Sequence, residues 1–529
     1  MKRLVLALLV IVGVGVVFAE EPVYFADERL KKAVKWELGV SNPTPRDMLG
    51  LTNFCAASRK IVDLTGLEYA TNLTELELGD NQITDISPLS GLMNLTELEL
   101  GSNQITDISP LSGLMNLTDL QLQKNYVRDI SALSGLTNLT DLSLYYNQIT
   151  DILPLSGLTK LTWLDLNGNQ ITEISALSGL TNLTKLFLIN NQITHISALS
   201  GLTNLTVLDL YNNQITDISA LSGLTNLDYL NLEGNQITNI SALSGLTNLT
   251  RLFLDKNQIT DISALSGLTN LTELRLYLNQ ITDISALSGV TNLTKLRVDH
   301  NQITNISPLS GLTKLTSLGL EKNQITDISA LSGLTNLRWL DLADNQIRDT
   351  DISALSGLTN LDYLNLEGNQ ITNISALSGL TNLTRLFLEN NQITDLSALS
   401  GLTKLRWLAL QCNPLSKQAH CAQVPLIRSN NPDLTSVNPP NPYDCECDDN
   451  SCECPCAGNM NLNEDDQRDL DDLDNLACLL LTAGPPFIQP VEPGHCGDLN
   501  ADGQLDLEDL QAVAGILLDA GSPFIAECR

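Results

Sequence analysis

The side chains most suited to chemistry lie near the C-terminus, between Asp498 and Asp509. Oxygen-bearing side chains occupy loop positions 1, 3, 5, 9 and 12 of this stretch, and Gly503 occupies position 6. Calcium takes six to eight oxygen ligands at flexible distances, and a glycine allows the sharp turn that such a loop needs. The spacing predicts a Ca²⁺ site, with an acidic surface loop as the alternative. Its expected ligands are the side chains of Asp498, Asn500, Asp502, Asp506 and Asp509 and the backbone carbonyl of Gln504.

The same stretch has the spacing of an EF-hand loop, with aspartate in place of the usual glutamate at its last position. A helix is expected after it, and a second loop-plus-helix unit spans 459–488. The two units share the matched phrases Leu470–Leu473 with Leu507–Leu510, and Ala483–Ile488 with Ala520–Ile525. The pair resembles a type I dockerin, the cohesin-binding module of cellulosome-like assemblies. The resemblance implies a small α-helical, calcium-binding domain over 456–529 with a cohesin-like protein partner.

The first of the two loops departs from this pattern. Glu464 replaces the turn glycine, and two residues are inserted before Asp469. Its candidate ligands are Asn459, Asn461, Asn463, Asp469 and Asp472. Neutral amides and the lost glycine weaken a calcium site, so we expect weak or no binding there.

Negative charge is concentrated in the same tail. Residues 433–529 hold 15 Asp and 6 Glu against 2 Arg, a net charge of −19, whereas the rest of the chain accounts for only −13 of the total of −32. A chain this acidic is a poor partner for nucleic acid. The uneven distribution favours a cation-binding tail over a general surface property.

Nine of the eleven cysteines lie at or after Cys421. Five of them fall between Cys445 and Cys456, beside several prolines, which predicts a stiff Pro/Cys-rich linker over 438–455. Their C-x-C spacing matches no zinc site known to us, so we favour disulfides, the default in an exported protein, over zinc. Cys412 and Cys421 lie one short loop apart and pair either with each other or elsewhere.

The N-terminal residues read as an export signal. Lys2 and Arg3 precede an apolar run from Leu4 to Phe18, and Ala19 is a small residue at a suitable cleavage point. This order of basic, apolar and small residues predicts a secretory signal peptide over 1–19. No later apolar run approaches the roughly 20 residues that cross a bilayer. We expect a secreted or cell-surface protein without a membrane span.

An asparagine marks sixteen copies of one 22-residue unit, from Asn81 to Asn345 and again at Asn369, Asn391 and Asn413. In the copy that contains Asn235, Leu230 and Leu232 alternate with polar residues, as in a strand with one buried face. The apolar residues that follow are spaced by three, which suits 3₁₀ turns. One such coil cannot bury its apolar side chains alone, so coils must stack. The Asn235 amide is expected to bond backbone groups of its own turn and a neighbour's.

This unit resembles the leucine-rich repeat, and the phrase NQITDISALSGLTN is most similar to the internalin-type bacterial subfamily. The resemblance implies an α/β fold: a leucine-rich repeat solenoid over 61–413 in which parallel strands line a concave face. Short 3₁₀ or irregular turns are then expected on the convex face. Each open end of such a stack exposes apolar side chains and a sheet edge, so it needs a cover.

Two covers are predicted. In a cap over 20–60, Asp27 and Gly39 bound a helix, and Thr44 with Pro45 opens a second short helix. The phrase Ile61–Leu67 reads as the back half of a coil whose strand is missing. A second cap over 414–437 is predicted to hold a helix that ends near Ile427 and is broken at Pro425.

One long segment occurs twice. Thr216–Leu254 is identical to Thr350–Leu388, and the two copies are six periods plus two residues apart. The two extra residues fall in Arg348–Asp351, which predicts a small bulge in the turn after Asn345. Such identity indicates a recent internal duplication and an array whose surface is under little positional constraint.

Aromatic residues gather at the outward strand positions, which hold 12 of the chain's 22 aromatic side chains. They are Tyr145, Tyr146, Trp163, Phe187, Tyr211, Tyr229, Phe253, Tyr277, Trp339, Tyr363, Phe387 and Trp407. Aromatic residues are enriched in binding hot spots, which favours a protein- or glycan-binding concave face. The alternative is that these residues only raise strand propensity and stack on each other.

No catalytic constellation is readable in the sequence. None of the four histidines has an evident nucleophile partner, and no glycine-rich phosphate loop occurs. We therefore predict a non-catalytic, exported binding protein with a concave recognition face and a calcium-ordered tail for attachment to another protein. The alternative is a structural spacer or cell-envelope component with no specific ligand on that face.

Calorimetric titration of residues 456–529 with Ca²⁺ tests the predicted tail. We expect one tight site, because only the loop from Asp498 to Asp509 has the full set of oxygen ligands, and we expect Asp498→Ala to remove it. Two tight sites would contradict our interpretation of the first loop, and heat that does not change with chelator would contradict the calcium site itself.

Overall fold

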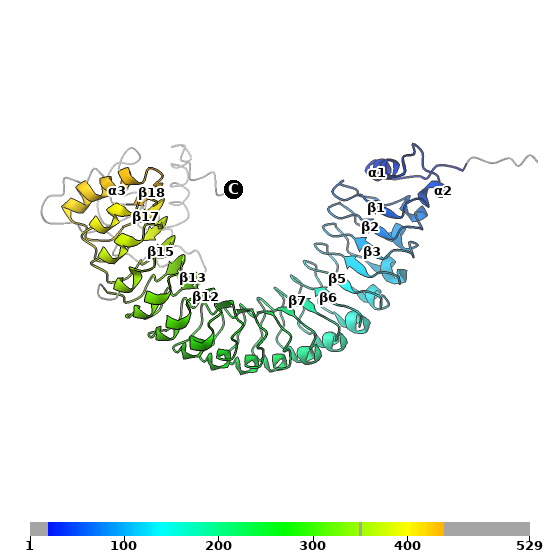
Figure 1. Cartoon of the computed structure of the whole chain (residues 1–529). Coiled ribbons are helices and arrows are strands. Elements are labelled where there is room, and N and C mark those ends of the chain that lie inside the picture. The colour runs from blue at the N-terminus through cyan, green and yellow to red at the C-terminus, as the bar shows by residue number, and fades with distance from the viewer. Residues whose placement is uncertain (1–19, 349–351, 439–529) are drawn as a thin grey trace, which may run out of the picture. The chain divides into compact units, whose positions relative to one another are not determined.

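The computed structural model describes residues 20–348 and 352–438. All of them fall within the first of two compact units, Met1–Glu446 and Cys447–Arg529. The predicted signal peptide, the linker and the whole calcium-binding tail, from Asp498 to Asp509 included, lie outside the described residues. Within the described residues, the chain forms one stack of coils (Figure 1).

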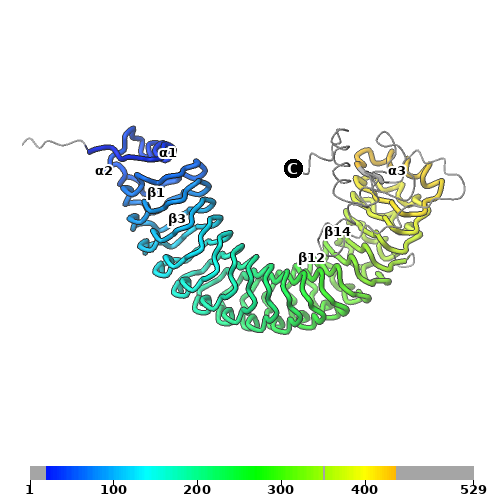
Figure 2. Tube along the Cα trace, turned by 180° about the vertical axis from the view of Figure 1, so that it is seen from behind, coloured from blue at the N-terminus to red at the C-terminus, as the bar shows by residue number. Residues whose placement is uncertain are grey.

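Each coil contributes one short strand, and every strand pairs in parallel with the next one along the chain. The described residues thus carry an 18-stranded sheet. Its strands are β1 (Asn53–Cys55), β2 (Glu75–Glu77), β3 (Glu97–Glu99), β4 (Asp119–Gln121), β5 (Asp141–Ser143), β6 (Trp163–Asp165), β7 (Lys185–Phe187), β8 (Val207–Asp209), β9 (Tyr229–Asn231), β10 (Arg251–Phe253), β11 (Glu273–Arg275), β12 (Lys295–Arg297), β13 (Ser317–Gly319), β14 (Trp339–Asp341), β15 (Tyr363–Asn365), β16 (Arg385–Phe387), β17 (Trp407–Ala409) and β18 (Ser436–Asn438). The strands line the inner side of the stack (Figures 1 and 2).

The opposite side is built from short 3₁₀ helices, as the spacing of apolar residues predicted. They run from η1 (Leu67–Tyr69) to η16 (Ser397–Gly401), one in each coil. In most coils an aspartate or asparagine starts the helix; for example, Asp217 Oδ1 accepts a hydrogen bond from the Ser219 backbone N–H at 2.8 Å. This local bond satisfies a backbone donor that the short helix leaves open.

The core is a continuous column of leucine and isoleucine. In the coil with β9, Leu230, Leu232 and Ile237 are completely buried, and the equivalent residues of the other coils are buried to the same degree. Removing this much apolar surface from water is the main drive for stacking.

A second buried column holds the asparagines. Asn235 Nδ2 donates to the carbonyl oxygens of Leu232, at 3.0 Å, and of Leu210 in the preceding coil, at 3.1 Å. Its Oδ1 accepts from the Ile215 backbone N–H at 3.0 Å. All sixteen asparagines are buried and make this set of bonds, which confirms that the amide joins one turn to the next.

The duplication does not disturb the sheet. Between β14 and β15 the paired residues Trp339 and Tyr363 are two positions further apart than in other coils, yet Leu340 still lies opposite Leu364. The Ile347 N–H donates to Asn369 Oδ1 at 3.0 Å, as in the regular coils. The sheet and the asparagine column therefore continue unchanged on both sides of residues 349–351, and the predicted bulge lies at these positions, outside the described residues.

The N-terminal cap begins with α1 (Glu28–Leu38), whose N-cap is Asp27 and whose C-cap, Gly39, has φ 68°. Asp27 also accepts a hydrogen bond from the Val62 N–H at 2.8 Å, which joins the helix to the first coil. The helix α2 (Pro45–Met48) follows, with Thr44 closing a capping box. Both helices lie where the sequence predicted them.

Two details of the caps differ from the sequence prediction. The strand thought missing before Ile61 is β1, which was overlooked because Asn53–Cys55 lacks the leucine that marks the other strands. Its central residue, Phe54, fills the core in leucine's place. In the C-terminal cap, Pro425 does not break a helix: a π turn at Ala419–Gln423 precedes it, and it lies in the first turn of α3 (Val424–Asn430). The π turn directly before α3, in which the Val424 N–H donates to the Ala419 carbonyl oxygen, lets the helical stretch continue past a residue that has no N–H.

Candidate ligand-binding face

Three columns of side chains project from the inner face of the sheet. Each coil contributes the first and third residues of its strand and the residue two positions after the strand; in the coil of β6 these are Trp163, Asp165 and Asn167. The parallel register places equivalent residues of successive coils side by side. The columns therefore form one surface, the inner face, on which only the side chains change from coil to coil.

The structure places eleven of the twelve predicted aromatic residues on this inner face. Trp163, Tyr229, Trp339, Tyr363 and Trp407 are first strand residues, Phe187, Phe253 and Phe387 are third strand residues, and Tyr145, Tyr211 and Tyr277 follow their strands. All are half-buried except Trp407, which is 42% exposed. Tyr146 is the exception to the prediction: it lies on the turn with φ 51° and is 56% exposed.

Four of these rings form a continuous aromatic ladder over the last four strands of the repeats. Trp339 stacks on Tyr363 with ring centroids 5.2 Å apart, and Tyr363 contacts Phe387 at 5.3 Å. Phe387 in turn contacts Trp407 at 6.3 Å. Stacking of this kind stabilises neighbouring strands, but it also leaves a flat apolar surface of the sort that anchors a ligand.

The middle of the inner face is charged and slightly concave. A hollow of about 350 Å³ is lined by Glu233, Asp255, Lys256, Glu273, Arg275, Tyr277, Lys295, Arg297 and Ser317. Within it, Glu273 pairs with Arg275 at 2.6 Å and with Lys295 at 3.6 Å. We call this region the central hollow; its half-exposed cations and carboxylates can pair with charged groups of a ligand.

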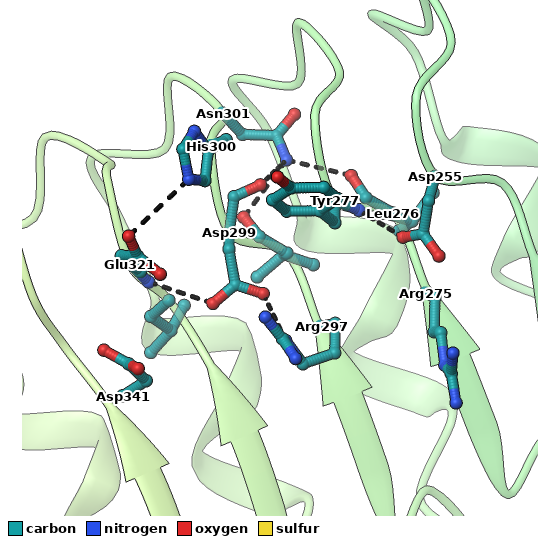
Figure 3. Close-up of polar contacts among 12 residues, drawn as sticks. Asp255, Arg275, Leu276, Tyr277, Arg297, Asp299, His300, Asn301, Glu321 and Asp341 are labelled. Carbon is teal, nitrogen blue, oxygen red and sulfur yellow. Dashed lines mark hydrogen bonds and ion pairs between the residues drawn. The ribbon is translucent and has the colours of Figure 1, made fainter. Parts of the chain in front are cut away.

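A network of polar contacts supports the wall of the central hollow (Figure 3). The completely buried Asp299 carboxylate pairs with Arg297 at 2.5 Å and accepts from the Glu321 backbone N–H at 3.2 Å. The Glu321 carboxylate lies 3.6 Å from His300 Nε2, and the His300 ring contacts Tyr277 with centroids 5.0 Å apart. These contacts fix the orientation of Arg297 and Tyr277, the two residues of this network that line the central hollow.

Several carboxyl groups of the inner face have a raised pKa. Burial raises the pKa of Asp255 to about 7, even though its Oδ1 accepts a 2.7 Å hydrogen bond from the Tyr277 backbone N–H. Burial likewise raises the pKa of Asp165 and of Asp341 to about 6 each. The charge of the inner face therefore changes near neutral pH.

The first strands present an acidic column that the search for aromatic residues missed. Glu75, Glu97, Asp119 and Asp141 lie opposite one another in consecutive strands. Burial raises the pKa of Asp119, and the neighbouring Asp141 raises it further. Aligning the repeats on their strand leucines would have revealed this column, as well as Glu273, Asp255 and Asp299 in the centre.

In residues 20–348 and 352–438, no group of three or more histidine, cysteine, aspartate and glutamate side chains is placed to hold a metal ion.

The raised pKa of Asp255 predicts a pH-dependent stability, and one substitution should reduce this dependence. Between about pH 4 and pH 7 the folded chain keeps the Asp255 proton that the unfolded chain loses, so the free energy of unfolding falls as pH rises. We expect this fall in the wild type to exceed that of Asp255→Asn by about 3 kcal/mol in urea denaturation, because the amide cannot ionise.

The matched control is Asp261→Asn, an exposed aspartate whose pKa is lowered by hydrogen bonds from Ser263. It should leave the pH dependence between about pH 4 and pH 8 as in the wild type. Equal pH dependence of the wild type and Asp255→Asn would contradict the raised pKa of Asp255.

Comparisons with known proteins agree with this architecture. Models of leucine-rich repeats match residues 71–113, 159–201, 203–245 and 247–289, and a second leucine-rich repeat model matches 116–171, 291–347, 313–371, 336–393 and 372–415. A search of curated proteins gives no significant match. None of the described helices is long and apolar enough to cross a membrane.

Several solved structures are similar. The internalin InlF of Listeria monocytogenes is 34% identical, with 69% of this chain and 96% of that chain covered and a TM-score of 0.53. The functional domain of InlJ from the same organism, which includes a cysteine ladder, is 26% identical, with 78% of each chain covered and a TM-score of 0.53. The plant peptide hormone receptor RGFR1 in complex with RGF2 is 27% identical, with 66% and 64% covered and a TM-score of 0.58.

The repeat models together span most of the solenoid, and the chain covers almost the whole of an internalin that is 34% identical. The chain therefore belongs to the leucine-rich repeat family, with internalins among its structural relatives.

Proposed function

We propose that this chain is an exported, non-catalytic protein that binds a protein ligand on its inner face. The observation that carries the proposal is the placement of eleven aromatic side chains on that face, around a hollow lined by charged groups. Binding hot spots are typically composed of half-exposed aromatic rings flanked by charged groups. None of these rings belongs to the core or to the asparagine column.

The relatives support a protein ligand. A similar structure is that of a peptide hormone receptor in complex with its ligand, and other similar structures are internalins. The mixture of cations and carboxylates in the central hollow suits charged side chains of a polypeptide better than a neutral glycan. A glycan ligand and a purely structural spacer are the competing functions.

We further propose that the C-terminal tail attaches the chain to another protein. The support is in the sequence: the calcium-loop spacing from Asp498 to Asp509 and the repeated loop-plus-helix unit. Ca²⁺ would order the tail, and a cohesin-like partner would bind it. Export follows from the signal-like residues 1–19 and fits the internalin relatives.

Replacing three inner-face aromatic residues tests the recognition proposal. We expect Trp163→Ala, Tyr211→Ala and Tyr277→Ala in one chain to lose at least about tenfold in affinity for the proteins that the wild type captures on a protein array, since hot-spot truncations cost 2 kcal/mol or more each. The reason is that each of the three rings presents half-buried apolar surface on the inner face.

The control combines Trp36→Ala, Tyr69→Ala and Tyr126→Ala, which removes the same numbers of tryptophan and tyrosine rings from exposed positions elsewhere. The control should bind as the wild type does. Equal capture by the two triple variants would contradict an inner-face site, capture of glycans alone would favour the glycan alternative, and no specific capture at all would favour the spacer.

A further inference from the structure

The duplicated segment places the same side chains on the inner face twice. Thr216–Leu254 and Thr350–Leu388 are identical in sequence. The first copy supplies β9 and β10, and the second supplies β15 and β16. Because each pair of strands has the same register, equivalent outward side chains recur in the same arrangement.

The first arrangement, patch 1, consists of Asp209, Tyr229, Asn231, Arg251 and Phe253. The Tyr229 hydroxyl donates to Asp209 Oδ2 at 3.1 Å. The Tyr229 ring meets the Phe253 ring edge-on, with centroids 5.5 Å apart, and the Arg251 guanidinium lies 4.8 Å from the Tyr229 ring. A buried carboxylate, two rings and an exposed cation thus form one compact surface.

The second arrangement, patch 2, consists of Asp341, Tyr363, Asn365, Arg385 and Phe387. The Tyr363 hydroxyl donates to Asp341 Oδ2 at 3.5 Å, and Asn365 Nδ2 donates to the same oxygen at 3.4 Å. The Tyr363 and Phe387 rings have centroids 5.3 Å apart, and the Arg385 guanidinium lies 5.3 Å from the Tyr363 ring. The three contacts of patch 1 are present again, although the two rings meet at 44° in patch 2 and at 88° in patch 1.

The likeness extends beyond the duplicated segment. Asp209 and Asp341 both precede it, in coils whose other outward residues differ, yet each accepts the tyrosine hydroxyl of the following strand and each is about 5% exposed. Stacking of the coils does not require this carboxylate, because the third strand residue differs between coils: it is Phe253 in β10 and Arg275 in β11. The aspartate–tyrosine contact thus occurs in both patches, although neither aspartate belongs to the identical segments. This supports the same function for the two patches.

We infer that patches 1 and 2 are two equivalent binding sites for one polypeptide epitope, and that the partner presents this epitope twice, head to tail. The inference rests on the proposed function and names the kind of partner it requires. A guanidinium and a carboxylate beside two rings can engage charged and apolar side chains of a polypeptide together.

The geometry of the sheet sets the spacing and the direction of the two epitopes. The patches lie six strand steps apart, which at about 4.8 Å a step is roughly 29 Å, or eight to nine residues of extended chain. All strands run parallel and the stack bends between the two patches (Figure 1), so the patches meet the partner in the same order along the stack but at an angle to each other. A tandem repeat meets this condition, whereas a two-fold symmetric dimer presents its epitopes in opposite directions.

Matched single variants of the full chain test the inference with selected peptides as probes. Phe387→Ala leaves only patch 1, and Phe253→Ala leaves only patch 2. We expect a peptide selected from a random displayed library against Phe387→Ala to bind Phe253→Ala with similar affinity, and calorimetry to find two equivalents on the wild type. The double variant should lose at least about tenfold, and two linked copies of the peptide should bind the wild type about 10²-fold or more tighter than one copy.

Arg251→Ala and Arg385→Ala repeat the test at exposed positions, so the result does not depend on how well the phenylalanine variants fold. A peptide that binds one patch and not the other, with one equivalent on the wild type, would overturn the inference and leave the proposed function intact. Two-site binding of a repeating neutral oligosaccharide in place of any peptide would overturn the polypeptide assignment. Failure to select any peptide sensitive to the inner face would contradict both proposals.

Discussion

The buried asparagine column is the constraint on which the rest of this structure depends. Each amide satisfies backbone groups of its own turn and of the coil before it, as Asn235 does with Leu232, Leu210 and Ile215. A buried backbone group left without a partner costs about 1–3 kcal/mol, so the column makes the interior position of each turn close to obligatory. Together with the leucine core, it fixes the spacing and register of every strand, even across the two extra residues before β15.

Because the interior is fixed, the outward residues are free to specify function. The first strands carry an acidic column, the middle carries paired charges around the central hollow, and the last strands carry the aromatic ladder. These three regions occupy equivalent positions of equivalent coils, so their differences reflect side chains alone. Burial of Asp165, Asp255 and Asp341 on this face also makes its charge depend on pH near neutrality.

Much of the fold was predictable from the sequence because each coil repeats the same short-range interactions. The strand leucines, the period of 22 residues and the asparagines dictated the sheet, and Asp27 with Gly39 dictated α1. Two predictions were wrong because they depended on tertiary surroundings. Phe54 replaces a strand leucine in β1, and Pro425 fits the first turn of α3. The aromatic positions were predictable from strand alternation. The ring pairs, the contact of the Asp299 carboxylate with the Glu321 backbone and the raised pKa of Asp255 were not, because they depend on neighbours 20 or more residues away or on burial.

Native-state hydrogen exchange tests most directly whether the asparagine column makes the coils one unit. The isoleucine amides that donate to asparagine, from Ile83 to Ile393, should exchange together at a single slow rate through the middle of the stack, with faster exchange only near the caps. Independent exchange of adjacent central coils would contradict the account, because the positions of the inner-face residues would then not be fixed relative to one another.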